Sequence, residues 1–295
     1  MRPQLLRASS ILILALSLLS TAGCSRVSIA YNSADFFIER YAKDYLGLDD
    51  PQIASWQPEL EANLAHHRRE DLPYLARFFD TAHKGALKGF DEKRMHCITD
   101  QFEELYRGHL GVAVNLAAPL LAKLTPVQIR ALDRKFREEA AEDKADTDPA
   151  GAARRDRKRA ERYQESMEWW LGTLTKEQKV IVQEQTAAMP DTAAAWISYR
   201  SGKRERLIRL LEKGAAETEV HRFLEGWLVK HQDLPPGLRR AKDRIGMRIS
   251  ELFVRMDATF SAKQRAHFAD RLATLRDDFL KLQRRPRMAT VKCSA

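Results

Sequence analysis

The sequence is poor in the residues that build hairpins and disulfide frameworks. It holds only 13 glycines, 11 prolines and 3 cysteines among 295 residues. No Asn-Gly or Asp-Gly pair marks a β-turn, and no run of alternating β-branched residues indicates a strand. The scarcity of cysteine excludes a small disulfide-rich scaffold. These absences leave a helical protein as the expected class.

Common catalytic motifs are also absent. The sequence contains no G-x-S-x-G elbow, P-loop, H-E-x-x-H or C-x-x-C pair. A nucleophile at His96-Cys97 is disfavoured, since neighbours on a helix do not face each other. We therefore expect no enzyme, no catalytic residues, no cofactor and no metal.

Long hydrophobic runs are lacking, and the longest lies near the N-terminus. Residues 11–19 are apolar and follow Arg2 and Arg7, which is the pattern of a secretory signal. The run is shorter than the roughly 20 residues that a membrane span requires. Cys24 follows five residues after the run, directly behind Ala22-Gly23.

The segment around Cys24 resembles a bacterial lipobox, although Thr21 stands where leucine is usual. The resemblance implies a signal peptide over residues 1–23, lipidation of Cys24 and a linker over residues 24–32. Ser25 after the cysteine implies the periplasmic face of the outer membrane. The alternative is ordinary signal cleavage with an incidental cysteine.

Charge favours anionic partners. Lysine and arginine outnumber aspartate and glutamate by 50 to 41, and removing residues 1–23 takes away two arginines, which leaves 48 to 41. A net charge of +7 after cleavage suits lipid headgroups or cell-wall carboxylates. Nucleic acid is not expected as a partner in that compartment.

Helical periodicity runs through the rest of the chain. Near the C-terminus, apolar residues recur at steps of three and four: Ile245, Ile249, Leu252, Phe253 and Met256. The sequence predicts an all-α bundle of amphipathic helices with no β-sheet. Turn formers at residues 146–151 divide it into helical halves over residues 33–147 and 148–283, packed as one unit, with a basic tail over residues 284–295.

One pentapeptide pattern recurs four times. Each copy has an apolar residue, then Thr, Ser or Asp, then glutamine three positions later, which is the pattern of a capping box at a helix start. The predicted caps are Asp49 with Gln52, Thr125 with Gln128, Thr175 with Gln178, and Ser261 with Gln264.

Two resemblances follow from these residues. The Leu124, Leu174 and Phe260 copies look like the LTxxQ motif of periplasmic stress chaperones and regulators of the Spy and CpxP type. The whole mature chain is similar to a family of uncharacterised Gram-negative lipoproteins. That similarity rests on the lipobox, the Leu48 motif and the stretch from His67 to Tyr74. It implies no established activity.

Three candidate sites remain. A candidate anionic-ligand patch comprises His67, Arg68, Arg69, Arg154, Arg155, Arg157, Lys158 and Arg159, each of which also fits a solvated helix face. The pairs His66 with Glu70 and His67 with Asp71 share helix faces but lack a third metal ligand. Cys97 and Cys293 either form a disulfide or remain a buried cysteine and a free thiol.

The expected function is binding of a protein or anionic envelope partner, in one form as a Spy-like chaperone or regulator. The alternatives are an envelope enzyme acting on a cell-wall or lipid substrate and a structural spacer. The sequence decides neither the partner nor the oligomeric state.

Overall fold

The computed structural model describes residues 26–145, 147 and 151–291. The prediction of an all-α protein is confirmed, since the described residues form helices and no strand. In chain order the helices are α2 (Arg26–Asn32), α3 (Ala34–Leu46), α4 (Asp50–Glu70), α5 (Leu72–Lys88), α6 (Glu92–Ala122), α7 (Pro126–Ala145), α8 (Ala152–Leu171), α9 (Lys176–Ala187), α10 (Ala193–Glu212), α11 (Glu217–Leu224), the π-helical turn η2 (Glu225–Val229), α12 (Pro236–Asp257) and α13 (Ala262–Lys281).

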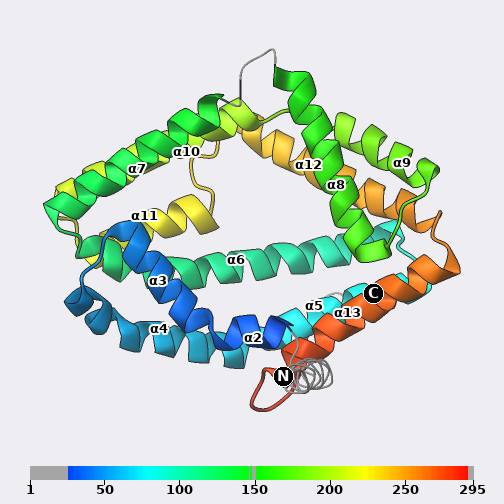
Figure 1. Ribbon diagram of the computed structural model, residues 1–295, viewed down its shortest axis with the longest axis horizontal. Coiled ribbons are helices and arrows are strands. Elements are labelled where there is room, and N and C mark those ends of the chain that lie inside the picture. The colour runs from blue at the N-terminus through cyan, green and yellow to red at the C-terminus, as the bar shows by residue number, and fades with distance from the viewer. Residues whose placement is uncertain (1–25, 146, 148–150, 292–295) are drawn as a thin grey trace, which may run out of the picture.

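The helices form an open frame with α6 crossing its middle (Figure 1). Helix pairs make the sides: α7 runs beside α10, and α5 runs beside α13. Helices α3 and α4 close one end, and α8, α9 and α12 close the other (Figure 1). The long helix α6 therefore reaches both ends of the molecule.

The apolar side chains gather in two main cores rather than one. Core 1 joins α4, the C-terminal part of α6, α7, α10 and α11. Core 2 joins α5, the start of α6, α8, α9, α12 and α13. Each core takes residues from both predicted halves of the chain, for example Leu207 in core 1 and Met95 in core 2. The halves are thus interlocked through shared cores.

The four recurrent motifs begin α4, α7, α9 and α13. In each, the Asp, Thr or Ser side chain accepts from the glutamine backbone N–H, and the glutamine Oε1 accepts from the backbone N–H of that cap residue. Such reciprocal bonds satisfy backbone donors that a helix start leaves unpaired. The motif apolar residues Leu48, Leu124 and Leu174 are buried in the cores.

Two of the motifs also bond to each other beside core 1. Gln52 Nε2 donates to Gln128 Oε1 at 3.1 Å, and Gln128 Nε2 donates to Gln52 Oε1 at 2.7 Å. Each amide then reaches the carbonyl that precedes the other motif, Gln128 to Gly47 at 2.7 Å and Gln52 to Lys123 at 3.3 Å. We call this arrangement the first glutamine clasp. It ties together the starts of α4 and α7.

The second glutamine clasp repeats this geometry at core 2. Gln178 and Gln264 exchange amide hydrogen bonds of 3.1 Å and 2.9 Å. Gln178 Nε2 also donates to the Thr259 carbonyl, and Gln264 Nε2 donates to the Thr173 carbonyl. Both glutamines are buried, Gln178 completely. Each amide uses both of its N–H groups and both oxygen lone pairs, so no polar group of the buried pair is left unpaired.

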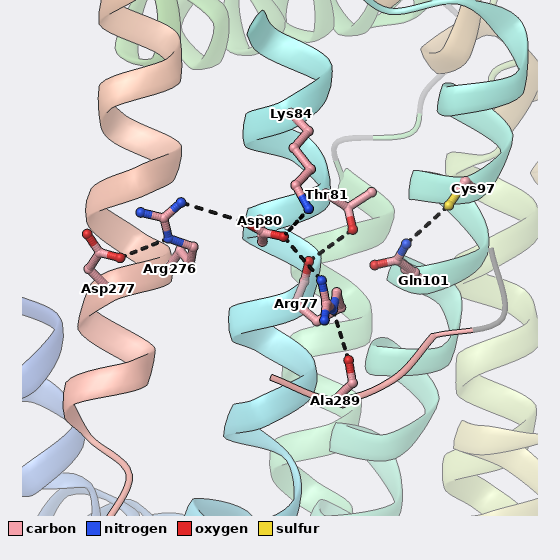
Figure 2. Close-up of polar contacts among 9 residues, drawn as sticks. All are labelled: Arg77, Asp80, Thr81, Lys84, Cys97, Gln101, Arg276, Asp277 and Ala289. Carbon is pink, nitrogen blue, oxygen red and sulfur yellow. Dashed lines mark hydrogen bonds and ion pairs between the residues drawn. The ribbon is translucent and has the colours of Figure 1, made fainter. Parts of the chain in front are cut away.

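Helices α5 and α13 are held together by a buried carboxylate. Asp80 on α5 lies 3.2 Å from Arg77, 2.9 Å from Lys84 and 3.6 Å from Arg276 of α13 (Figure 2). A buried carboxylate is tolerated because several cations surround it. Arg77 also donates to the Ala289 carbonyl at 2.9 Å, which fixes the C-terminal segment against α5 (Figure 2).

The second clasp can be separated from simple helix capping by one isosteric change. Gln178→Glu keeps the carbonyl-type oxygen that caps Thr175 but removes both donors, so an acidic oxygen faces the Thr259 carbonyl and Gln264 Oε1. We expect it to lower the free energy of unfolding by about 2–4 kcal/mol, because buried groups lose their partners. Urea denaturation followed by circular dichroism measures the change.

Gln183→Glu is the matched control, since Gln183 is exposed on the same helix. Its effect should stay within about 0.5 kcal/mol. Equal stability of the Gln178→Glu variant and the original chain would contradict the clasp, because glutamate serves a capping box as well as glutamine does.

Candidate functional site

The surface of the α5–α6 hairpin carries a row of four aromatic rings, of which three are exposed and Phe78 is half-buried. Tyr74 and Phe78 lie one turn apart on α5, and Phe102 and Tyr106 lie one turn apart on α6. The Phe78 and Phe102 ring centroids are 6.3 Å apart, and Phe102 and Tyr106 stack at 6.2 Å. Phe102 is 56% exposed and Tyr106 is 50% exposed. We call these four residues the aromatic strip.

A cavity of about 210 Å³ opens beside the aromatic strip. Its walls come from the start of α5, the middle of α6 and the C-terminal segment, and its lining residues are Asp71, Tyr74, Gln101, Glu104, Leu105, Gly108, His109 and Val291. Tyr74 belongs to both features, so the cavity and the strip form one continuous surface. The lining combines two carboxylates, a histidine and apolar atoms.

Two histidines meet next to the cavity. The rings of His67 and His109 contact edge to face at 5.0 Å between centroids. Tyr31 Oη lies 2.9 Å from His67 Nδ1, and burial raises the pKa of Tyr31 to about 12. Tyr31 therefore keeps its phenolic proton at neutral pH, and its hydroxyl and His67 Nδ1 share one hydrogen bond. His109 Nδ1 lies 2.6 Å from the Leu105 carbonyl, so this nitrogen carries the hydrogen.

The electrostatics of this cluster favour neutral His67. Burial lowers the pKa of His67 below the ordinary value of 6.5, and the neighbouring His109 and His66 rings lower it further, while Asp71 opposes the shift. Within the described residues, the buried Asp71 Oδ2 has no hydrogen-bond partner. This oxygen has almost no accessible surface, although Asp71 itself lines the cavity.

The arginines of the predicted patch mostly serve contacts within the fold. Arg68 donates to the Leu282 carbonyl and to Asn32, and its guanidinium lies 4.9 Å from the Tyr31 ring centroid. Arg69 pairs with the adjacent Glu70 at 2.8 Å. The contacts of Arg68 join α4 to α2 and to the end of α13.

The second group of patch residues lies on α8, at the opposite end of the frame from α4 (Figure 1). Arg155 pairs with Asp191 at 2.7 Å, and Arg159 pairs with Asp156 at 2.6 Å. Exposed side chains belong to Arg154, Arg157 and Lys158. The structure thus does not bring the predicted patch together as one surface.

Cys97 is buried on α6 and is disulfide-bonded. Gln101 Nε2 donates to its Sγ at 3.2 Å (Figure 2). A disulfide sulfur is no thiolate, and the neighbouring His96 side chain is exposed and paired with Asp100. A nucleophilic Cys97 is thus disfavoured on structural grounds. Cys24 and Cys293, the other cysteines, lie outside the described residues.

The two histidines of the metal-ligand pairs noted in the sequence have different neighbours. His66 contacts Arg69, whereas His67 faces Tyr31 and His109. Nowhere in the described part of the chain do three or more His, Cys, Asp or Glu side chains come together as metal ligands would. Of the helices that the structure describes, none has both the length and the apolar content that a membrane span requires.

Sequence reasoning missed the aromatic strip and the contact between His67 and His109. Spacing of four residues between Phe102 and Tyr106, and between Tyr74 and Phe78, was the available signal. That signal places two rings on one face of a helix without telling which face is covered.

The stability of the chain should depend on pH through His67. The unfolded chain takes up a proton near pH 6.5 that the folded chain resists, so stability is lost as the pH falls below 6.5 and regained as it rises. His67→Gln should reduce the loss in the free energy of unfolding between about pH 7 and pH 5, as measured by urea denaturation. His66→Gln keeps the buried His67 ring and should retain the original slope, and a slope unchanged by His67→Gln would refute the assignment.

We expect the partner of Cys97 to be Cys293. Ala289 N–H donates to the Pro73 carbonyl, and Val291 lines the cavity together with Gln101, one turn from Cys97. Cys293 lies two positions beyond Val291 in the sequence, a reach of at most about 7 Å. Peptide mapping without reduction should recover a fragment that joins the two cysteines. Recovery of Cys293 as a free thiol would overturn the pairing.

A family model described as a family of unknown function (DUF6279) matches residues 44–235, more than half of the 295-residue chain. The match includes the aromatic strip and both histidines and ends before α12. No curated protein and no solved structure matches the chain. The chain therefore belongs to this family of unknown function, as its resemblance to an uncharacterised family led us to expect.

Proposed function

We propose that this member of the DUF6279 family is a lipoprotein of the bacterial envelope that works by binding a partner. In this proposal Cys24 carries the lipid, and the helical body lies on the periplasmic face of the outer membrane. The basic segment, short apolar run and cysteine near the N-terminus support the anchor. Two acyl chains on one residue suffice for a stable attachment.

The aromatic strip is the observation that supports binding. Aromatic side chains dominate the energetics of protein interfaces, and grouped exposed apolar residues mark interaction sites. The neighbouring charges form a polar rim, with Glu103 paired to Arg107 at 2.9 Å and to Lys242 at 3.2 Å. A row of rings with a charged border suits a segment that is apolar on one side and polar on the other.

A chaperone of the Spy type is the specific form that we favour for this activity. The rings come from two rigid helices and offer stacking surfaces with few directional hydrogen bonds. Such a surface accepts apolar segments of many sequences, as a chaperone of unfolded envelope proteins requires. A single assembly partner would instead exploit the cavity next to Tyr74 for specific contacts.

One observation favours an enzyme as the second candidate. Asp71, Glu104 and His109 line the same cavity, and paired carboxylates with a histidine are suitable for acid–base work on a cell-wall or lipid substrate. If Asp71→Asn abolished turnover of a cell-wall or lipid substrate while the aromatic strip stayed intact, the result would support this candidate over binding alone.

Crosslinking in living cells tests the proposed function. We expect the original chain to capture envelope proteins and Phe102→Ser/Tyr106→Ser to capture about tenfold less, because two interface rings are lost. Many unfolded proteins would indicate a chaperone, and one stoichiometric partner would indicate an assembly component. Absence of any captured protein would refute both forms of binding.

Two further variants serve as controls in that experiment. Val180→Ser/Met247→Ser removes two similarly exposed apolar side chains from α9 and α12 and should leave capture unchanged. Cys24→Ala should remove the chain from the membrane fraction and abolish incorporation of labelled palmitate. Incorporation of labelled palmitate that survives Cys24→Ala would refute the anchor.

A further inference from the structure

The first two helices of the described chain present apolar side chains to solvent. Four of the twelve large apolar side chains that are exposed among the described residues fall within residues 29–41. These four side chains are those of Ile29, Phe36, Phe37 and Tyr41, and their exposed fractions range from 57% to 68%. No residue of α3 is buried. We call these four side chains the outer face of α2–α3.

Helix α3 already has an apolar side that the fold uses. Ile38, Ala42 and Tyr45 pack against core 1, at positions three and four apart. Phe37 and Tyr41 form a second row one turn apart, directed elsewhere on the same helix. Packing of the fold buries the first row against core 1. In the second row Tyr41 stacks on Tyr45 at 5.5 Å between centroids, yet both side chains of that row remain largely exposed to solvent.

The outer face lies close to the residue that carries the lipid in the proposed function. Cys24 precedes Arg26, the first residue of α2, by two positions, which limits their separation to about 7 Å. Residues 26–46 would span at most about 31 Å as helix. An acylated Cys24 therefore keeps the outer face within reach of the bilayer surface, because few residues separate the two.

From these observations we infer that the outer face of α2–α3 lies in the headgroup region of the bilayer. This inference rests on the lipid anchor proposed above, and it adds a second, noncovalent contact with the phospholipids. Aromatic rings suit this depth, since an apolar body can enter the acyl boundary while a polar tip stays hydrated. Such a contact fixes the orientation of the helical frame, which a lipid tether alone leaves free to swing.

The charges on α3 indicate that this contact depends on apolar insertion rather than on headgroup charge. Helix α3 carries both acidic and basic side chains, and its two basic residues are engaged, Arg40 beside Asp44 at 3.6 Å and Lys43 with Asp50. The helix therefore offers no basic cluster for anionic lipids. Contact with the bilayer should persist at high salt.

Photo-crosslinking in native membranes tests the inference on the full chain. Benzoylphenylalanine is introduced in place of Phe37 or Tyr41, the cells are illuminated, and the purified chain is analysed by mass spectrometry for phospholipid adducts. We expect adducts at both positions, at least about tenfold more abundant than with benzoylphenylalanine in place of Met247. Met247 is equally exposed but lies on α12.

Palmitate labelling of the same samples distinguishes the two proposals. Labelled chain with no more adduct at positions 37 and 41 than at 247 would overturn the inference and leave the anchor intact. Adducts to a protein or to a second copy of the chain would overturn it equally. Unlabelled chain would refute the anchor and, with it, the tether on which the inference depends.

Discussion

A buried glutamine needs partners for two donors and for an acceptor with two lone pairs, and this requirement organises the fold. In the second glutamine clasp, where both glutamines are buried, the requirement is met by the backbone N–H of the cap residue, the amide of the second glutamine and the carbonyl ahead of the other motif. The half-buried first clasp makes the same set of bonds. The bonds also engage the carbonyl ahead of each motif, so the clasp fixes two loops as well as two helix starts. Removing one amide would deprive the other of one hydrogen-bond donor and one acceptor, which makes each pair a single unit.

The two clasps lie at separate cores, and α6 is the element that unites them. Its first turns belong to core 2, and its last turns belong to core 1. Between Gln101 and Val114 the helix has no buried residue. This middle stretch of α6 carries Phe102, Tyr106 and the cavity wall, so the candidate site occupies the part of the helix that neither core requires.

The sequence was sufficient to predict the helix starts but not their pairing. A capping box involves residues three apart, and its chemistry can be identified from the pattern alone. The clasp bonds join residues 76 and 86 positions apart, and no local pattern encodes which helix starts meet. The same limit applies to the contact between His67 and His109. The density of basic residues predicted an anionic-ligand patch that the fold does not assemble, because Arg68, Arg155 and Arg159 are engaged in contacts within the fold.

The contacts behind the aromatic strip bear on how it would bind. Asp80 holds α5 against α13, and Arg77 fixes the C-terminal segment (Figure 2). The Cys97 disulfide restrains α6. The rings are thus mounted on a backbone that is already ordered, and each ring has only two side-chain torsions to restrict. Binding would therefore forfeit little conformational entropy. Because little ordering cost has to be offset, non-directional apolar contact with the rings can contribute most of the free energy of any binding at this surface.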